Sequence, residues 1–309
     1  MPFRKARKGV GRLEAEFLGQ SRTHPLPIFV LFNESIPGKS GSSMSNRIDD
    51  TFSRLAAEGS KAFVAYVCAG DPDMERSLEI IKGLADAGAD ILELGLPFSD
   101  PLADGVVNQM AADRALKAGA TTTKVLDLVR RFRETHQQPI ILYAYLNPII
   151  TYGWDKFHED AAAAGVDGIL PLDLPPDEAA LHPEMARTHG LHTIHLIAPT
   201  TPAERVAMLA GNSGGFIYAL SRTGVTGAHG APSDTIGEQV AAIKQHTETP
   251  VCVGFGITTP EHASMVAAVS DGIVVGSAIV KQIEANADDP QVAEKVAAFT
   301  KPLIEAAKR

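Results

Sequence analysis

The sequence has few cysteines, no long apolar run and no excess of basic residues. Cys68 and Cys252 are its only cysteines, and both lie in apolar, strand-like segments. Two such thiols argue against a disulfide framework and are typical of a reducing compartment, so we expect a cytoplasmic protein. No apolar stretch approaches the roughly 18 residues of a membrane span. The net charge of −9 argues against nucleic-acid binding, because such surfaces are basic.

The first 43 residues differ from the rest in charge. They hold seven Lys or Arg and three Glu, a net charge of +4, which leaves −13 for residues 44–309. The Gly- and Ser-rich stretch at 37–43 is typical of a flexible linker. We therefore expect residues 1–43 to be a basic, disordered extension and residues 44–309 to form one domain.

Residues 44–309 alternate between strand-like and helical patterns. Eight short apolar segments are predicted strands: Ala62–Cys68, Asp90–Leu94, Ile140–Ala144, Gly168–Leu172, His192–Ile197, Gly215–Ala219, Val251–Gly254 and Gly272–Val275. Helical spacing of apolar residues fills the intervals, and a first helix is expected at about 46–58. A doubly wound open sheet has the same local pattern. Eight repeats in one domain favour an α/β fold, the (β/α)8 TIM barrel, with an extra N-terminal helix.

Two carboxylates stand out near the end of the second predicted strand. Glu93 interrupts the apolar run from Ile91 to Gly95, and Asp104 follows in a Pro-containing loop. Burial should raise the pKa of Glu93, whereas Asp104 in a polar loop should stay ionised, which would divide acid and base roles between them. The residues alone leave another interpretation open, in which Glu93 pairs inside the barrel and Asp104 is an ordinary turn residue.

Glycine motifs follow the last two predicted strands, at 254–256 and at 276–277. Glycine lets the backbone approach an anion, and a helix N-terminus offers unpaired N–H groups, so these motifs predict a phosphate site. Gly-x-Gly also occurs in plain turns.

No metal site is predicted. His192 and His195 lie three positions apart on one predicted strand and so should point to opposite faces. Tyr66, Tyr143 and Phe255 are most simply residues of the barrel core.

Several motifs occur in the order typical of one enzyme family. They are Gly70-Asp71-Pro72, the twelve residues LGLPFSDPLADG from Leu94 to Gly105, Tyr145-Leu146-Asn147-Pro148, Asp173-Leu174-Pro175-Pro176, SRTGVTG from Ser221 to Gly227, Gly254-Phe255-Gly256-Ile257 and Gly276-Ser277-Ala278-Ile279-Val280. From about residue 44 onward the chain resembles the tryptophan synthase alpha chain family. The resemblance implies cleavage of indole-3-glycerol phosphate to indole and glyceraldehyde 3-phosphate, with no cofactor in this chain.

The resemblance also assigns roles to single residues. Glu93 would be the general acid and base, and Asp104 the partner of the indole nitrogen. Thr226 would lie on a lid beside the loop acid. The other implied substrate-binding residues are Tyr66 and Phe255 near the indole ring, Tyr218 at the end of the sixth strand, and Gly227, Gly256, Gly276 and Ser277 around the phosphate.

A partner is implied as well: a pyridoxal-phosphate beta chain that receives indole in an α2β2 heterotetramer. The apolar residues Phe98, Pro148, Ile149 and Ile150 near the site should form a contact rim. Val106 stands where the family usually has proline, which should loosen the preceding loop.

Three alternatives remain open from the sequence. The chain could be a freestanding indole-3-glycerol-phosphate lyase, or an allosteric subunit that mainly activates a partner. A phosphosugar isomerase on a similar barrel would share the phosphate site but not the two acids.

Deleting residues 1–43 should leave the melting temperature and the lyase rate of the domain unchanged, because a basic, Gly- and Ser-punctuated segment has no core to join. Expressing the chain from Met44 and comparing both quantities with the full chain tests this. A large loss of either would show that the extension packs against the domain or its partner.

Overall fold

Parallel strands form a single sheet that curves into a ring. The structure is a computed structural model that describes residues 46–174, 181–221, 235–254 and 256–308. The strands in these ranges are β1 (Ala62–Cys68), β2 (Ile91–Gly95), β3 (Ile140–Ala144), β4 (Gly168–Pro171), β5 (His192–Thr193), β6 (His195–Ile197), β7 (Ile217–Leu220), β8 (Val251–Gly254) and β9 (Gly272–Val275). Their order in the sheet is β5-β4-β3-β2-β1-β9-β8-β7-β6.

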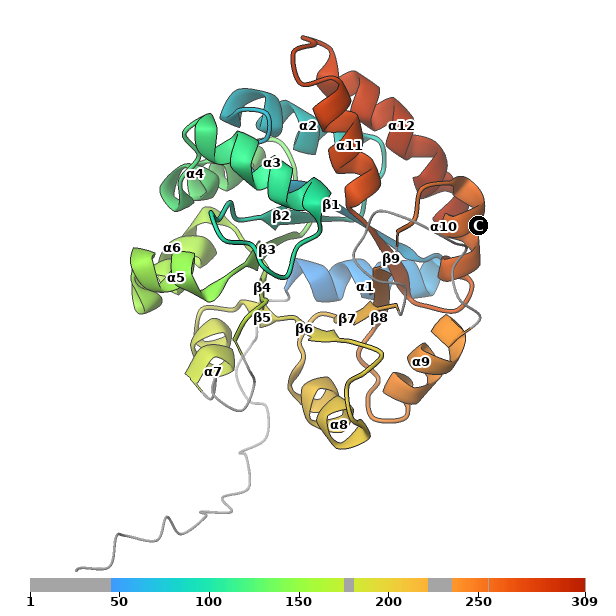
Figure 1. The fold of residues 1–309 in the computed structure, drawn as a ribbon. Helices are drawn as coiled ribbons and strands as arrows, with labels where there is room; N and C mark the ends of the chain where they lie inside the picture. The colour runs from blue at the N-terminus through green and yellow to red at the C-terminus, as the bar shows by residue number, and fades with distance from the viewer. Residues whose placement is uncertain (1–45, 175–180, 222–234, 255, 309) are drawn as a thin grey trace, which may run out of the picture. The chain divides into compact units, whose positions relative to one another are not determined.

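Helices surround this ring (Figure 1). Over the same ranges they are α1 (Arg47–Glu58), α2 (Met74–Asp86), α3 (Val106–Lys117), α4 (Thr122–Arg133), α5 (Leu146–Tyr152), α6 (Trp154–Ala164), α7 (Leu181–Thr188), α8 (Ala203–Asn212), α9 (Thr235–Lys244), α10 (Pro260–Ala267), α11 (Ser277–Ala285) and α12 (Val292–Ala307). No helix in the described part of the chain is long and apolar enough to cross a membrane. The predicted TIM barrel is confirmed.

The fifth predicted strand, His192–Ile197, is present in two pieces. Its first half, β5, pairs with β4, and its second half, β6, pairs with β7. Between them, the amide N–H of Ile194 donates to the carbonyl of Ile169 at 2.9 Å. One segment therefore changes partner along its length and brings the two ends of the sheet together, which is why eight predicted strands become nine.

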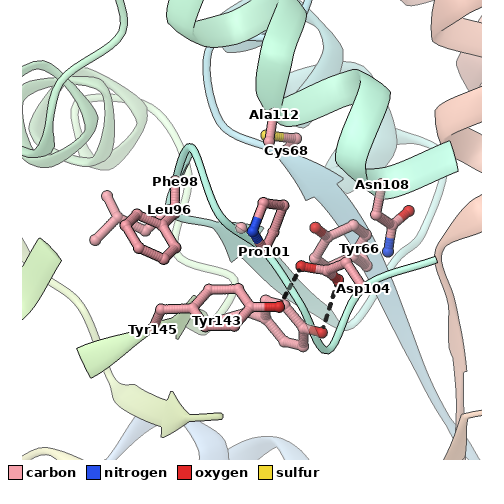
Figure 2. A pocket seen from close by; sticks show the side chains of 11 residues that line it. Tyr66, Cys68, Leu96, Phe98, Pro101, Asp104, Asn108, Ala112, Tyr143 and Tyr145 are labelled. Carbon is pink, nitrogen blue, oxygen red and sulfur yellow. Dashed lines mark hydrogen bonds between the residues drawn. The ribbon is translucent and has the colours of Figure 1, made fainter. Parts of the chain in front are cut away.

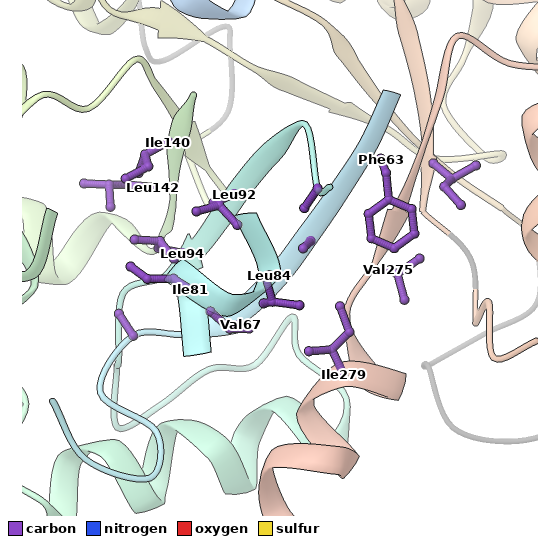
Figure 3. Close-up of a cluster of buried hydrophobic side chains, with 14 of the residues drawn as sticks. Phe63, Val67, Ile81, Leu84, Leu92, Leu94, Ile140, Leu142, Val275 and Ile279 are labelled. Atoms are coloured by element: carbon purple, nitrogen blue, oxygen red, sulfur yellow. The ribbon is translucent and has the colours of Figure 1, made fainter. Parts of the chain in front are cut away.

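Side chains alternate between the two faces of each strand, as the period of two requires. The outward ones build the larger core against the helices. In Figure 3, Phe63, Val67, Leu92 and Leu94 from β1 and β2 gather with Leu84 of α2. All of these side chains are at most 1% exposed, and they belong to one continuous apolar layer between the strands and the helices.

Helix α1 closes the N-terminal end of the barrel. Its start is defined by Asn46, whose side chain accepts the Ile48 N–H at 2.9 Å. Ile48, Phe52 and Leu55 share one face of the helix and belong to the inner apolar cluster. The Phe52 ring lies 5.9 Å from that of Phe216. The predicted extra N-terminal helix thus acts as a plug.

Three aspartates hold the same end of the barrel together. Each precedes a strand, and its carboxylate accepts an N–H at the start of the neighbouring strand: Asp90 from Phe63 at 2.9 Å, Asp167 from Ile140 at 2.8 Å and Asp271 from Val251 at 2.8 Å. Lysine or arginine side chains pair with all three. Ion pairs, hydrogen bonds and apolar packing thereby hold the N-terminal end of the barrel together. The candidate site residues lie at the opposite end.

Candidate active site

Glu93 points into the barrel from the middle of β2. It lies in register with Tyr66 of β1 and Ile141 of β3 and is 1% exposed. Neither of its carboxylate oxygens has a hydrogen-bond partner among the described residues. Burial, and secondarily the charge of Asp104, raise the pKa of Glu93 from 4.5 to about 8. At neutral pH the side chain is therefore a neutral acid that can donate a proton.

Asp104 reaches the same interior from the loop between β2 and α3, residues 96–105, which we call loop two. Two phenols hold its carboxylate: Tyr143 donates to Oδ1 and Tyr145 to Oδ2, each at 2.9 Å (Figure 2). The pKa of Asp104 is raised by burial, and hydrogen bonds from Tyr143, Tyr145 and Asn108 offset part of that rise. Glu93 has no such donors, so Asp104 is the acid that is better stabilised as an anion.

Aromatic rings wall the space beside the two acids. The rings of Tyr66 and Tyr143 meet edge to face, with centroids 5.2 Å apart. A Cβ at Gly95 would lie 2.5 Å from the Tyr66 hydroxyl, so only glycine fits there. The cavity beside Asp104 measures about 10 Å³, which is room for about one water molecule.

The two glycine motifs lie at the C-terminal ends of β8 and β9. A Cβ at Gly254 would collide with the Tyr218 hydroxyl, and one at Gly276 would lie 3.1 Å from Cδ1 of Tyr66. Gly276 caps the N-terminus of α11, and the buried Oγ of Ser277 has no partner among the described residues. Gly256 is exposed, and its Cβ would meet open space. Gly254 and Gly276 therefore make room for the side chains of Tyr218 and Tyr66.

A strand acid, a loop acid held by phenols and a helix start bordered by glycine thus lie at one end of the barrel, and the sequence around them matches a known family. The sequence model of the tryptophan synthase alpha chain covers residues 52–308. The chain belongs to the tryptophan synthase alpha chain family.

Individual relatives agree over the whole barrel. The tryptophan synthase alpha chain of Opitutus terrae is 48% identical over 265 residues, which is 85% of this chain and 100% of that protein. The alpha chain of Desulfatibacillum aliphaticivorans is 47% identical over 84% of this chain and 98% of its own length. The crystal structure of the alpha chain from Legionella pneumophila superposes with a TM-score of 0.78 at 38% identity, over 85% of this chain and 97% of that one.

As an alpha chain of tryptophan synthase, the protein is a carbon–carbon lyase that cleaves indole-3-glycerol phosphate. The activity inferred from the resemblance is confirmed, and the family relation does not favour a freestanding lyase.

The fold places most of the predicted site residues at one end of the barrel. Glu93, Asp104, Tyr66 and Tyr218 lie close enough to influence one another's pKa, and Gly276, which precedes Ser277, contacts Tyr66. Thr226, Gly227 and Phe255 lie outside the described residues.

Sequence reasoning missed the donors to Asp104. Tyr143 is predicted to be only a core residue, and this is incomplete, because its hydroxyl binds Asp104. Tyr145 and Asn108 were not assigned to the site either. Alternation along the third strand places 141, 143 and 145 on the inner face. It does not reveal that loop two folds back over them.

The two histidines have separate partners. His192 bonds Asp49 at 2.9 Å, and His195 lies 3.3 Å from the Ser213 hydroxyl. In the part of the chain that the structure describes, no three His, Cys, Asp or Glu side chains are placed to hold a metal ion.

Glu93→Gln should stabilise the protein increasingly as the pH rises. Between the ordinary pKa of 4.5 and about 8, the unfolded chain loses a proton that the folded chain keeps, so the free energy of unfolding falls with pH. Glutamine removes that dependence. We therefore compare the melting temperature of the variant with that of the parent at each pH. The difference should grow in favour of the variant by on the order of a few degrees between about pH 5 and about pH 8.

Thermal unfolding at several pH values measures this gain. Glu79→Gln, at an exposed position of α2, is the control and should differ from the parent by a constant amount. A pH-independent difference for Glu93→Gln would mean that the Glu93 pKa is ordinary.

Proposed function

We propose that Glu93 is the general acid and base of the cleavage and that Asp104 stabilises the charge on the indole nitrogen. The observation that carries this is the contrast between the two carboxyls: Glu93 is buried without a hydrogen-bond partner among the described residues, and Asp104 is held by two phenols. Environments that separate the pKa values of two acids separate their roles.

The reaction is a retro-aldol cleavage without a carbonyl to accept electrons. Neutral Glu93 protonates indole C3, and the ring nitrogen becomes cationic. The carboxylate of Asp104 accepts the ring N–H and stabilises that charge. The Glu93 carboxylate then takes the proton of the hydroxyl next to the breaking bond. The bond electrons return to the ring, which releases indole and an aldehyde, and Glu93 is protonated again.

The phosphate of the substrate binds at the start of α11. The N–H groups of its first turn and the unpartnered Ser277 hydroxyl support this placement beside Gly276. Gly256 and Gly227 complete the phosphate site, and Thr226 contacts the substrate. Tyr66, Tyr218 and Phe255 surround the indole ring. A phosphosugar isomerase would have no use for a second acid held by phenols.

Glu93→Gln should lower kcat about 10²–10⁴-fold, because it removes the proton donor. Asp104→Asn should lower it roughly 10²–10³-fold through loss of the stabilising charge. Release of indole by the full chain under saturating substrate measures both. The exposed Glu79→Gln variant should match the parent. Near-parent rates for Glu93→Gln would remove Glu93 from the mechanism.

We further propose that a pyridoxal-phosphate beta chain docks beside loop two and receives indole in an α2β2 complex. Exposed apolar side chains support this docking surface: Leu102 is 91% exposed, Val106 68%, Ile150 57% and Met110 46%. Ile149 does not belong to it, since it is 0% exposed and packs in the core, so its predicted place in the rim is wrong. Partner contact would order loop two, which is followed by Val106 instead of the usual proline.

Leu102→Asp should weaken binding to a purified tryptophan synthase beta chain at least about tenfold, because it places a charge in an apolar contact. Met265→Asp, at a 48%-exposed position of α10, is the matched control. Titration calorimetry measures the affinity, and indole release with and without the beta chain measures activation. If Leu102→Asp binds the beta chain as tightly as the parent does, and if the beta chain does not change the rate of indole release, the freestanding lyase is the better description.

The chain itself would need no cofactor, since every proton transfer above is made by a carboxyl, and pyridoxal phosphate would belong to the partner. A cytoplasmic location fits the two cysteines. Cys68 and Cys252 are free and buried, and burial raises the pKa of both thiols, which keeps them protonated.

A further inference from the structure

Tyr143 and Tyr145 approach Asp104 from two different supports. Tyr143 lies in β3, in register with Gly95 of β2. Tyr145 follows the strand at the N-terminus of α5. Each phenol donates to a different oxygen of the Asp104 carboxylate, at 2.9 Å in both cases.

The two phenols do different things for loop two. The Tyr145 hydroxyl also accepts the backbone N–H of Ala103 at 2.9 Å, so it holds the loop backbone as well as the carboxylate. The hydroxyl of Tyr143 has one hydrogen bond to the described residues, and that bond goes to Asp104. Tyr143 therefore acts on the carboxylate alone, from a strand fixed on both sides by β2 and β4.

The ring of Tyr143 has little freedom to move its hydroxyl away. Its edge-to-face contact with Tyr66 lies on one side, and Tyr66 is itself 5% exposed. Gly95 opposite Tyr143 leaves the space that Tyr66 fills. A rigid donor of this kind is what keeps a catalytic group within a fraction of an ångström of its productive place.

We propose that Tyr143 is a positioning residue for the cleavage, whose hydroxyl fixes Oδ1 of Asp104 so that the free lone pairs of the carboxylate face the indole N–H. This rests on the role proposed for Asp104. A carboxylate offers about four acceptor sites; the two phenols occupy two of them and Asn108 a third. One site therefore remains for the ring N–H while the carboxylate stays held.

The same hydrogen bond opposes the effect of burial on Asp104. Burial raises the pKa of Asp104, and the Tyr143 and Tyr145 hydroxyls lower it. Glu93 acts as an acid only while protonated, and Asp104 only while ionised. The plot of kcat/KM against pH should therefore be bell-shaped, with Asp104 on the acidic limb and Glu93 on the alkaline limb.

Tyr143→Phe tests this, because it removes one oxygen atom and keeps the ring. With the full chain and indole-3-glycerol phosphate, we expect kcat to fall about 10- to 100-fold, the loss of one hydrogen bond to a charged group. KM should change less. The acidic limb should move to higher pH, because Asp104 then takes up a proton more readily, and the alkaline limb should stay. A limb position does not depend on the fraction of folded enzyme, so it remains informative if the variant is less stable.

Tyr152→Phe is the matched control. Its hydroxyl also donates to a carboxylate, that of Asp160 at 2.5 Å, but on α5 and α6, away from the acids. It should keep the parent kcat and both limbs.

A double-mutant cycle with Asp104→Asn separates this proposal from the proposed function. If Tyr143 acts through Asp104, adding Tyr143→Phe to Asp104→Asn should lower kcat no further. If Asp104→Asn is inactive but Tyr143→Phe keeps the parent kcat and both limbs of the pH profile, the role of Tyr143 is overturned and that of Asp104 stands. An Asp104→Asn variant with parent activity would overturn the role of Asp104 and, with it, that of Tyr143.

Discussion

A carboxyl group that is buried and has no hydrogen-bond partner in the described part of the chain is the constraint around which this barrel is organised. Glu93 is 1% exposed, and burial raises its pKa to about 8. Such a group weakens the fold above the ordinary pKa of glutamate, so the rest of the barrel must hold it in place. The apolar layer outside β1 and β2 and the plug formed by α1 do so. The same burial that lowers the stability of the fold keeps the Glu93 carboxyl protonated at neutral pH, so that it can donate a proton.

The two ends of the barrel treat aspartate in opposite ways. At the N-terminal end, Asp90, Asp167 and Asp271 accept strand N–H groups and pair with Lys or Arg. At the C-terminal end, Asp104 is held by phenols, which donate hydrogen bonds but bring no charge. In the mechanism we propose, a cation there would neutralise the carboxylate that faces the developing positive charge. The phenols instead lower the pKa of Asp104 without bringing a charge of their own.

Much of this arrangement could be predicted from local patterns. Apolar runs of four to seven residues locate the strands to within two residues, because burial on both faces demands them. The interruption of one run by Glu93 marks the site for the same reason. The split at Ile194 could not be predicted, because hydrogen bonding to β4 and then to β7 depends on how the ring closes. The burial of Ile149 was missed because it lies on the inner side of a short helix.

The sequence by itself determined the repeating βα order, the family and the identity of both acids, since these depend on residue types and spacings along the chain. Only the tertiary structure decided what surrounds the acids. Tyr143 and Tyr145 lie about forty positions from Asp104 in sequence, with separations of 39 and 41. Periodicity says which face of a strand a tyrosine occupies, but not which loop folds over that face. The hydrogen bonds that hold Asp104, and the glycines that make room for the rings, exist only once the barrel has closed.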